Sequence, residues 1–121
     1  MTKLLVADDD VDVRDFLKEE LSKAGFTVVV VGNGADAVVA VAEQAIDLIV
    51  LDMLMPGLDG IQVIRVLRKI TPNIPIIGLT GYVGRGFMSQ ALELGVHILG
   101  KPVVIPELIK EINQALANKK N

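Results

Sequence analysis

Five short runs of mostly branched aliphatic residues recur along this chain, and a segment with helical periodicity follows each of them. The runs extend over Lys3 to Ala7, Phe26 to Val31, Ile46 to Leu51, Pro75 to Leu79 and His97 to Leu99. A run that stays apolar without alternating is typical of a strand whose sheet is covered on both faces, as parallel sheets are. Right-handed crossovers between successive units then predict an α/β fold: a doubly wound, five-stranded parallel sheet with strand order 2-1-3-4-5.

The segments between these runs predict the helices that cover the sheet. In the first segment, apolar residues spaced i, i+3 and i+4 extend from Val13 to Ala24, and Gly25 supplies a stop signal. Further helices are expected at about residues 35–44, 60–70 and 86–94 and, with Pro106 in its first turn, near the C-terminus. No linker or internal repeat interrupts the alternation, so we expect residues 1–121 to form a single domain.

The composition excludes several classes of protein. Cysteine is absent, which excludes zinc–thiolate sites, iron–sulfur clusters and thiol catalysis and suits a reducing compartment, so the cytoplasm is the expected location. The net charge is −3 and the basic residues are scattered, so no nucleic acid is expected as a partner. The apolar runs are far shorter than the roughly 18 residues that a membrane span needs, so no membrane association is expected.

Polar side chains stand at the ends of four of the expected strands. Asp8 and Asp9 follow the first strand, Asp52 the third, Thr80 the fourth and Lys101 the fifth. In such sheets, ligands bind beyond the carboxyl ends of the strands, beside the point where the winding direction reverses. Because the first and third strands are neighbours in the expected order, Asp8, Asp9 and Asp52 are expected to lie within a few ångströms of one another.

Three adjacent carboxylates repel one another unless their pKa values rise or a divalent cation lies between them. Oxygen ligands in a partly hydrated site suit magnesium, and we favour the cation. A lysine charge and a hydroxyl opposite the carboxylates suit phosphoryl transfer, in which the protein positions and neutralises phosphoryl oxygens. Asp52 is then a candidate covalent nucleophile. Asp10 has a simpler explanation as the cap of the first helix.

These residues resemble a known family, the receiver domains of two-component response regulators, of which the single-domain chemotaxis regulators are the smallest members. The resemblance extends over essentially the whole chain. It is carried by Asp8-Asp9, the stretch from Leu51 to Gly60, Thr80-Gly81 and Lys101-Pro102. It implies a flavodoxin-like strand order and a phosphorylation-controlled switch rather than an enzyme, and no output domain is visible in residues 1–121.

The resemblance also implies partners and a reaction. Asp52 would accept a phosphoryl group from a phosphohistidine on a sensor histidine kinase or a histidine phosphotransfer protein. Thr80 and Lys101 would contact the phosphoryl oxygens. The phosphorylated protein would then bind an unidentified downstream protein.

A magnesium ion is implied by the same resemblance. Its ligands would be Asp9, Asp52 and the backbone carbonyl of Leu54, with Asp8 acting mostly through water. Pro56 would help to shape the loop that follows Asp52.

Departures from the family pattern concern the aromatic residues of the switch. Most receivers have Tyr or Phe at the position of Ile98, where a ring turns inward as the threonine moves toward the phosphoryl group. Val103 likewise replaces a common Phe. Tyr82 is a candidate substitute, in a glycine-rich segment that ends at Gly86.

Two alternatives remain beside the receiver interpretation. A haloacid-dehalogenase-like phosphatase would use the segment from Asp10 to Val13 as its aspartate motif, but it leaves Asp52 without a role. A receiver-like docking module that works without phosphorylation is favoured slightly by the missing aromatics. The complete set of acidic, threonine and lysine residues disfavours it, because a site without chemistry has no reason to keep repelling carboxylates.

Overall fold

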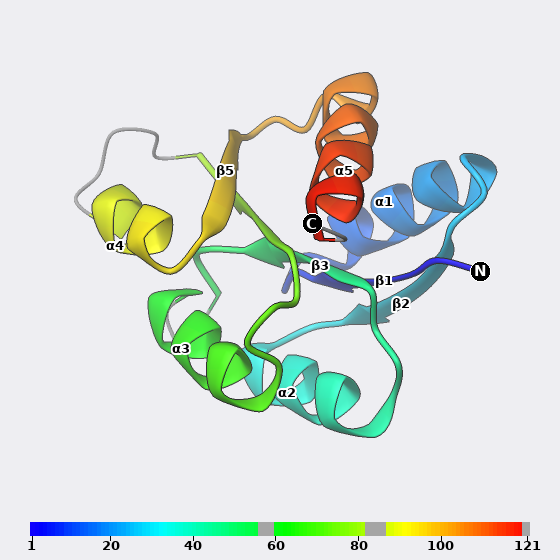
Figure 1. Cartoon of the computed structure of the whole chain (residues 1–121). Coiled ribbons are helices and arrows are strands. Elements are labelled where there is room, and N and C mark those ends of the chain that lie inside the picture. Colours follow the sequence, from blue (N-terminus) through cyan, green and yellow to red (C-terminus); the bar gives the residue numbers. More distant parts are fainter. Residues whose placement is uncertain (56–59, 82–86, 120–121) are drawn as a thin grey trace.

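Strands and helices alternate along the chain in the computed structural model, which describes residues 1–55, 60–81 and 87–119 (Figure 1). In chain order the elements are β1 (Lys3–Ala7), α1 (Val11–Lys23), β2 (Thr27–Val31), α2 (Gly34–Glu43), β3 (Leu48–Asp52), α3 (Gly60–Ile70), β4 (Ile76–Thr80), α4 (Phe87–Glu93), β5 (Val96–Gly100) and α5 (Ile105–Lys119). Among the described residues, no helix has the length and apolar character needed to cross a membrane.

The strands form one parallel sheet in the order β2-β1-β3-β4-β5. In its register, Leu5 of β1 lies beside Val29 of β2 on one side and Ile49 of β3 on the other. The winding direction reverses between β1 and β3, because β2 lies outside β1 and all later strands lie beyond β3. This architecture confirms the predicted fold class and strand order.

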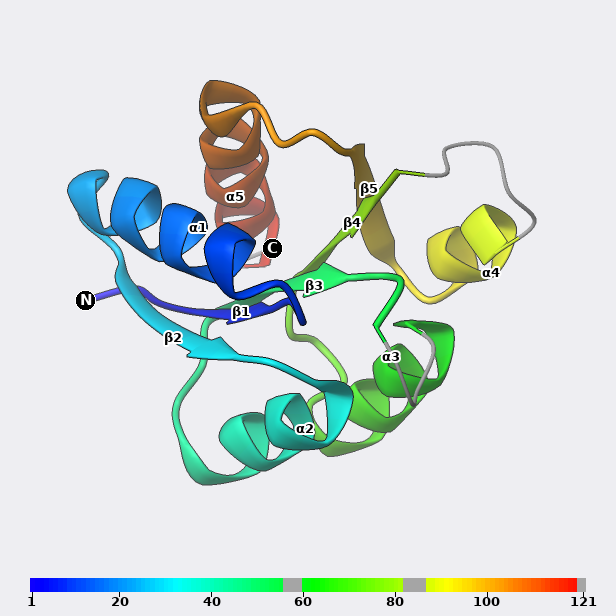
Figure 2. The same cartoon turned by 180° about the vertical axis from the view of Figure 1, so that it is seen from behind.

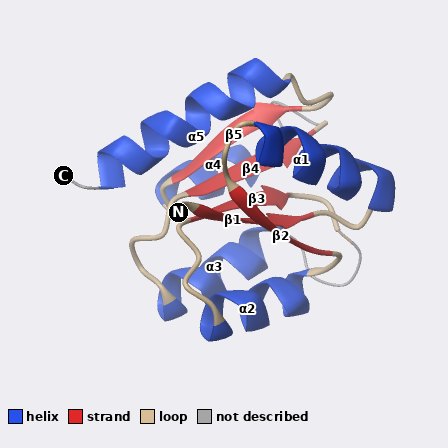
Figure 3. Ribbon diagram, turned by 90° about the vertical axis from the view of Figure 1, so that its right-hand side faces the viewer, coloured by secondary structure: helices blue, strands red, loops and turns tan. Residues whose placement is uncertain are grey.

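A separate apolar cluster fills each face of the sheet. Leu17 of α1 and Ile112 of α5 pack on one face with Leu4, whereas Leu5 points into the other cluster, which holds buried residues of α2 and α3 and Ala91 of α4. Figure 2 shows α1 and α5 on one side of the sheet and α2 and α3 on the other. The same three layers are seen edge-on in Figure 3. The sheet therefore has both faces covered, as its apolar strands require.

The outer strands are less buried than their apolar runs suggest. Every residue of β3 and β4 is buried, but every residue of β2 is only half-buried. β2 and β5 are the edges of the sheet, with one neighbouring strand each. The expectation of strands buried on both faces is therefore confirmed at the centre of the sheet and wrong at its edges.

Local hydrogen bonds shift some element boundaries from their expected places. β3 begins at Leu48 rather than Ile46, because the Asp47 carboxylate accepts a hydrogen bond from the Lys3 amide at 2.7 Å and holds the preceding residues in the connection. Helix α1 already begins at Val11, where Asp10 caps it. Its end agrees with the expectation, since Gly25 has a φ of 98°, in the left-handed region that glycine adopts freely.

Gly60 is required by a close approach at the start of α3. A Cβ added there would lie 2.9 Å from the Met53 Cα and 3.0 Å from the Met53 carbonyl oxygen, which are backbone atoms that cannot rotate away. We expect Gly60→Ala to lower the free energy of unfolding by about 1–3 kcal/mol, measured by urea denaturation. Gly81→Ala is the control, since its Cβ would meet no described heavy atom within 4 Å. Equal losses in the two variants would contradict this reading of Gly60.

Candidate phosphoacceptor site

Three carboxylates meet at the carboxyl ends of β1 and β3. Oxygen atoms of Asp8, Asp9 and Asp52 all lie within 4.8 Å of one another. Asp8 and Asp52 are almost fully buried, with 1% and 4% of their surface exposed, while Asp9 is exposed. The neighbouring positions of β1 and β3 at the switch point bring the three together, as predicted.

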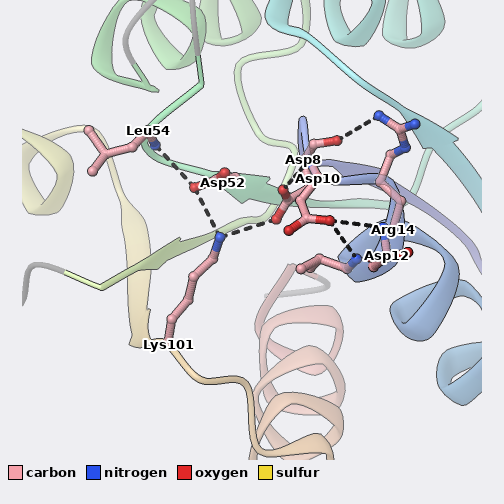
Figure 4. Close-up of polar contacts among 8 residues, drawn as sticks. Asp8, Asp10, Asp12, Arg14, Asp52, Leu54 and Lys101 are labelled. Carbon is pink, nitrogen blue, oxygen red and sulfur yellow. Dashed lines mark hydrogen bonds and ion pairs between the residues drawn. The ribbon is translucent and has the colours of Figure 1, made fainter.

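Lys101 lies between the two buried carboxylates (Figure 4). Its Nζ is 3.2 Å from Asp8 Oδ2 and 3.4 Å from Asp52 Oδ1. The lysine directly follows β5, and its amide donates a hydrogen bond to the Thr80 carbonyl at 2.8 Å. The peptide bond that joins it to Pro102 is cis. The Lys101 side chain thus extends from the end of β5, past β4, and its ammonium group contacts the carboxylates at the ends of both β1 and β3.

Burial and mutual charge shift the ionisation of this cluster. Burial raises the pKa of Asp52 above its ordinary value, and the Asp8 charge raises it further, while the Leu54 amide and Lys101 oppose the rise. For Lys101, partial burial alone would lower the pKa, but the charges of Asp52 and Asp8 outweigh it and raise the pKa. The site therefore attracts cations and holds excess negative charge.

Two further predicted residues adjoin Asp52. Thr80 ends β4 and is 1% exposed, in the strand next to β3. Leu54 contacts the cluster through its backbone amide, which donates a hydrogen bond to Asp52 Oδ1 at 3.1 Å. The Leu54 carbonyl as a metal ligand stays a prediction.

Asp10, the third acidic residue of the first loop, serves the helix rather than the cluster. Asp10 is the N-cap of α1, and its carboxylate accepts hydrogen bonds from the amides of Asp12 at 2.9 Å and Val13 at 3.4 Å. This confirms its simpler explanation. It also places the motif proposed for the phosphatase alternative in a helix cap.

Several predicted residues lie outside the described residues, among them Pro56, Tyr82 and Gly86. Ile98, at the position of the usual switch aromatic, is described and half-buried. A Cβ added at Gly78 would lie 2.9 Å from Ile98 Cδ1 and 2.8 Å from Met53 Sδ. The space beside Gly78 on β4 is therefore filled by a side chain of β5 and by the residue that follows Asp52.

Arg14 supports the site but was not among its predicted residues. Its Nη1 donates a hydrogen bond to the carbonyl oxygen of Asp8 at 3.0 Å, so a residue of α1 supports the loop that carries the carboxylates. The sequence does indicate this contact, because Arg14 lies in the first turn of α1 and helical side chains are directed toward the N-terminus, here toward the loop with the carboxylates.

The chain matches the family model of the response regulator receiver domain over residues 4–113. It belongs to the receiver domain family. This receiver is 33% identical over 117 residues to the response regulator receiver protein CpdR of Brucella abortus, with 96% of this chain and 98% of that protein covered. It is 32% identical over 120 residues to the sporulation initiation phosphotransferase F of Bacillus subtilis, with 98% and 97% covered.

A solved structure supports the same assignment. The receiver domain of the Francisella response regulator 1452 is 34% identical to this receiver and superposes with a TM-score of 0.89, covering 98% of both chains. Receiver domains are phosphorylation-controlled switches of two-component systems, phosphorylated by kinases or phosphotransfer proteins. The predicted membership of the receiver family and its phosphoacceptor function are thus confirmed at the level of the family. The comparisons give no support to the phosphatase alternative or to a docking module that works without phosphorylation.

Proposed function

We propose that Asp52 is the phosphoacceptor of this receiver and takes a phosphoryl group from a phosphohistidine on a histidine kinase or phosphotransfer protein. The observation that supports this most strongly is the pairing of a buried carboxylate with a lysine at the switch point, Nζ of Lys101 lying 3.4 Å from Asp52 Oδ1. Of the two buried carboxylates, Asp52 ends the central strand β3. Each oxygen of Asp8 accepts a hydrogen bond, whereas the contacts of Asp52 with the Leu54 amide and Lys101 Nζ both fall on Oδ1. Asp52 is therefore the better nucleophile.

The proposed transfer is a displacement at phosphorus. An Asp52 carboxylate oxygen forms a bond to phosphorus while the bond between phosphorus and the imidazole nitrogen of the donor breaks. The electron pair of the broken bond stays on that nitrogen, and the imidazole regains a proton from solvent. Lys101 and the Thr80 hydroxyl contact the phosphoryl oxygens and neutralise the charge that they bring.

The carboxylate cluster fits a divalent cation. Three carboxylates with oxygens within 4.8 Å suit a hard cation with oxygen ligands, and Lys101 shows that the cluster accepts positive charge. We assign magnesium, held by Asp9, Asp52 and the Leu54 carbonyl, with Asp8 acting mostly through water. Bound magnesium would neutralise negative charge on the phosphoryl oxygens and so reduce the repulsion between Asp52 and an anionic phosphoryl donor.

Phosphorylation would serve as a switch rather than as a step in turnover. Residues 1–121 would act as one domain in the cytoplasm, with a kinase or phosphotransfer protein upstream and another protein as the target. In the phosphorylated state, Thr80 and Lys101 would leave their present positions for the phosphoryl oxygens. The hydrogen bond from the Lys101 amide to the Thr80 carbonyl holds the backbones of these two residues together, so both side chains belong to the same edge of the sheet.

Intact-mass measurement after treatment with acetyl phosphate tests this proposal. With magnesium, we expect one added phosphoryl group per chain; with EDTA, we expect little or none. A Thr80→Ala variant serves as a control that keeps all three carboxylates, and it should still be phosphorylated. Equal phosphorylation with magnesium and with EDTA would contradict the metal-dependent site.

The ionisation of Asp52 offers a separate check. Because the fold favours the neutral carboxyl group, the unfavourable contribution of ionised Asp52 to stability is present at neutral pH and disappears as the pH falls through its raised pKa. In metal-free protein, we expect a carboxyl carbon resonance that titrates above the ordinary value of 3.8 and is missing in Asp52→Asn. A titration midpoint at or below 3.8 would contradict the role of burial.

A further inference from the structure

The carboxylate-bearing loop after β1 is held in place through Asp8. The Asp8 amide donates to the Val31 carbonyl of β2 at 3.1 Å, and its Oδ1 accepts from the Asp10 amide at 3.0 Å. The remaining backbone group, the Asp8 carbonyl, accepts from Arg14 Nη1 at 3.0 Å (Figure 4). That carbonyl belongs to the peptide unit between Asp8 and Asp9. Arg14 therefore sets the orientation of the peptide from which the exposed Asp9 carboxylate projects.

Gly32, directly after β2, makes room for the Arg14 guanidinium. A Cβ added at Gly32 would clash with Arg14 Nη1 and lie 3.4 Å from Arg14 Cζ, and it would meet no other described heavy atom within 4 Å apart from its chain neighbours. The φ of Gly32 is not in the left-handed region, so alanine would fit the backbone. An alanine at this position would thus displace the same nitrogen atom that bonds to Asp8.

The charge and the hydrogen bond of Arg14 have opposite effects on cation binding. Its positive charge repels a cation, whereas its hydrogen bond orders the loop that carries the carboxylates. Among the described residues, Arg14 forms no ion pair with a carboxylate, and its guanidinium contacts the backbone of Asp8 rather than the acidic side chains. Because Arg14 is partly exposed, solvent weakens the repulsion between its charge and a bound cation. Orientation of the loop is therefore the larger effect, because an ordered ligand loses less conformational entropy when it binds a metal.

We propose that Arg14 is a positioning residue for the divalent-cation site and that Gly32, which lacks a Cβ, leaves the space that its guanidinium occupies. Arg14 would fix the peptide between Asp8 and Asp9 and so hold Asp9 ready as a ligand. This inference rests on the proposed function, since it assigns a role toward the same cation. It adds two residues to the site, neither of which touches the cation or the phosphoryl group.

Binding of Mn²⁺ alone to the full chain tests this inference, with the signal of free Mn²⁺ followed by electron paramagnetic resonance. We expect Arg14→Ala and Gly32→Ala each to raise the Kd by about 10-fold. Lys18→Ala, which removes a positive charge from an exposed position on the same helix, should leave the Kd unchanged. The double variant of Arg14 and Gly32 should bind no more weakly than Arg14→Ala, because without the guanidinium the new methyl group meets nothing.

A merely structural role would give a different pattern. It would lower the urea midpoint in EDTA but leave the Mn²⁺ affinity of the folded protein within about twofold of the wild type, and that result would overturn the inference. Losses of affinity that add in the double variant would also overturn it, since the two residues would then act separately. Wild-type protein that fails to bind Mn²⁺, or whose binding is unaffected by Asp52→Asn, would instead contradict the proposed function itself.

Discussion

Asp52→Asn is expected to abolish magnesium-dependent phosphorylation and, at the same time, to make the metal-free protein more stable. The amide cannot attack phosphorus, so the loss of phosphorylation is complete. The substitution also removes a charge whose burial, and then its repulsion by Asp8, raises the pKa of Asp52. We expect the free energy of unfolding to rise on the order of 1 kcal/mol at neutral pH.

Intact mass and urea denaturation measure the two effects. Asp15→Asn is the matched control, because it makes the same chemical change at an exposed position of α1. The control should keep wild-type phosphorylation and change stability by less than about 0.5 kcal/mol. Stoichiometric phosphorylation of the Asp52→Asn protein would refute the assignment of the acceptor.

Lys101→Met is expected to destabilise the metal-free protein by about 1–3 kcal/mol. Its Nζ is the cation shared by Asp8 and Asp52, and without it two buried carboxylates face each other unpaired. We place the loss below that of a fully buried pair, because 29% of the Lys101 side chain is exposed. The raised pKa of Lys101 means that its stabilising contribution is fully present at neutral pH and is lost only as the pH rises through that pKa.

Added magnesium should reverse much of this loss, because a divalent cation supplies the missing positive charge. Urea denaturation with EDTA and with magnesium measures the reversal, and Lys69→Met on the exposed side of α3 is the control. Lys101→Arg is expected to restore charge but not signalling, since a planar guanidinium is a poor substitute for a compact ammonium group. A Lys101→Met protein as stable in EDTA as the wild type would contradict the role of this contact.

The residue pattern carried enough information to predict the sheet and most of the site. Apolar runs and glycine stops gave the alternation of elements, and the rule for ligand sites in open sheets then brought Asp8, Asp9 and Asp52 to one edge. The capping role of Asp10 also followed from local chemistry, since a carboxylate before a helix satisfies free amides. These features depend on short stretches of sequence or on one general rule of topology.

Features that depend on contacts between distant segments could not be predicted in this way. The approach of Arg14 to Gly32 joins α1 to the end of β2, and neither residue has an unusual neighbour in the sequence. The approach of Met53 and Ile98 to Gly78 likewise involves three separate strands or their ends. The predicted strand order already placed β2 at the sheet edge, but its continuous apolar run alone predicts full burial, so its half-buried state was missed.

Chemical identification of the residue that carries the phosphoryl group tests directly whether Asp52 is the acceptor. Borohydride reduces an aspartyl phosphate to homoserine, and mass spectrometry of the resulting peptides identifies the residue that has changed. After treatment with acetyl phosphate and magnesium, we predict homoserine at position 52 and none at the positions of Asp8 and Asp9. Homoserine at either of those two positions, or a phosphoryl group that borohydride leaves in place, would contradict the assignment.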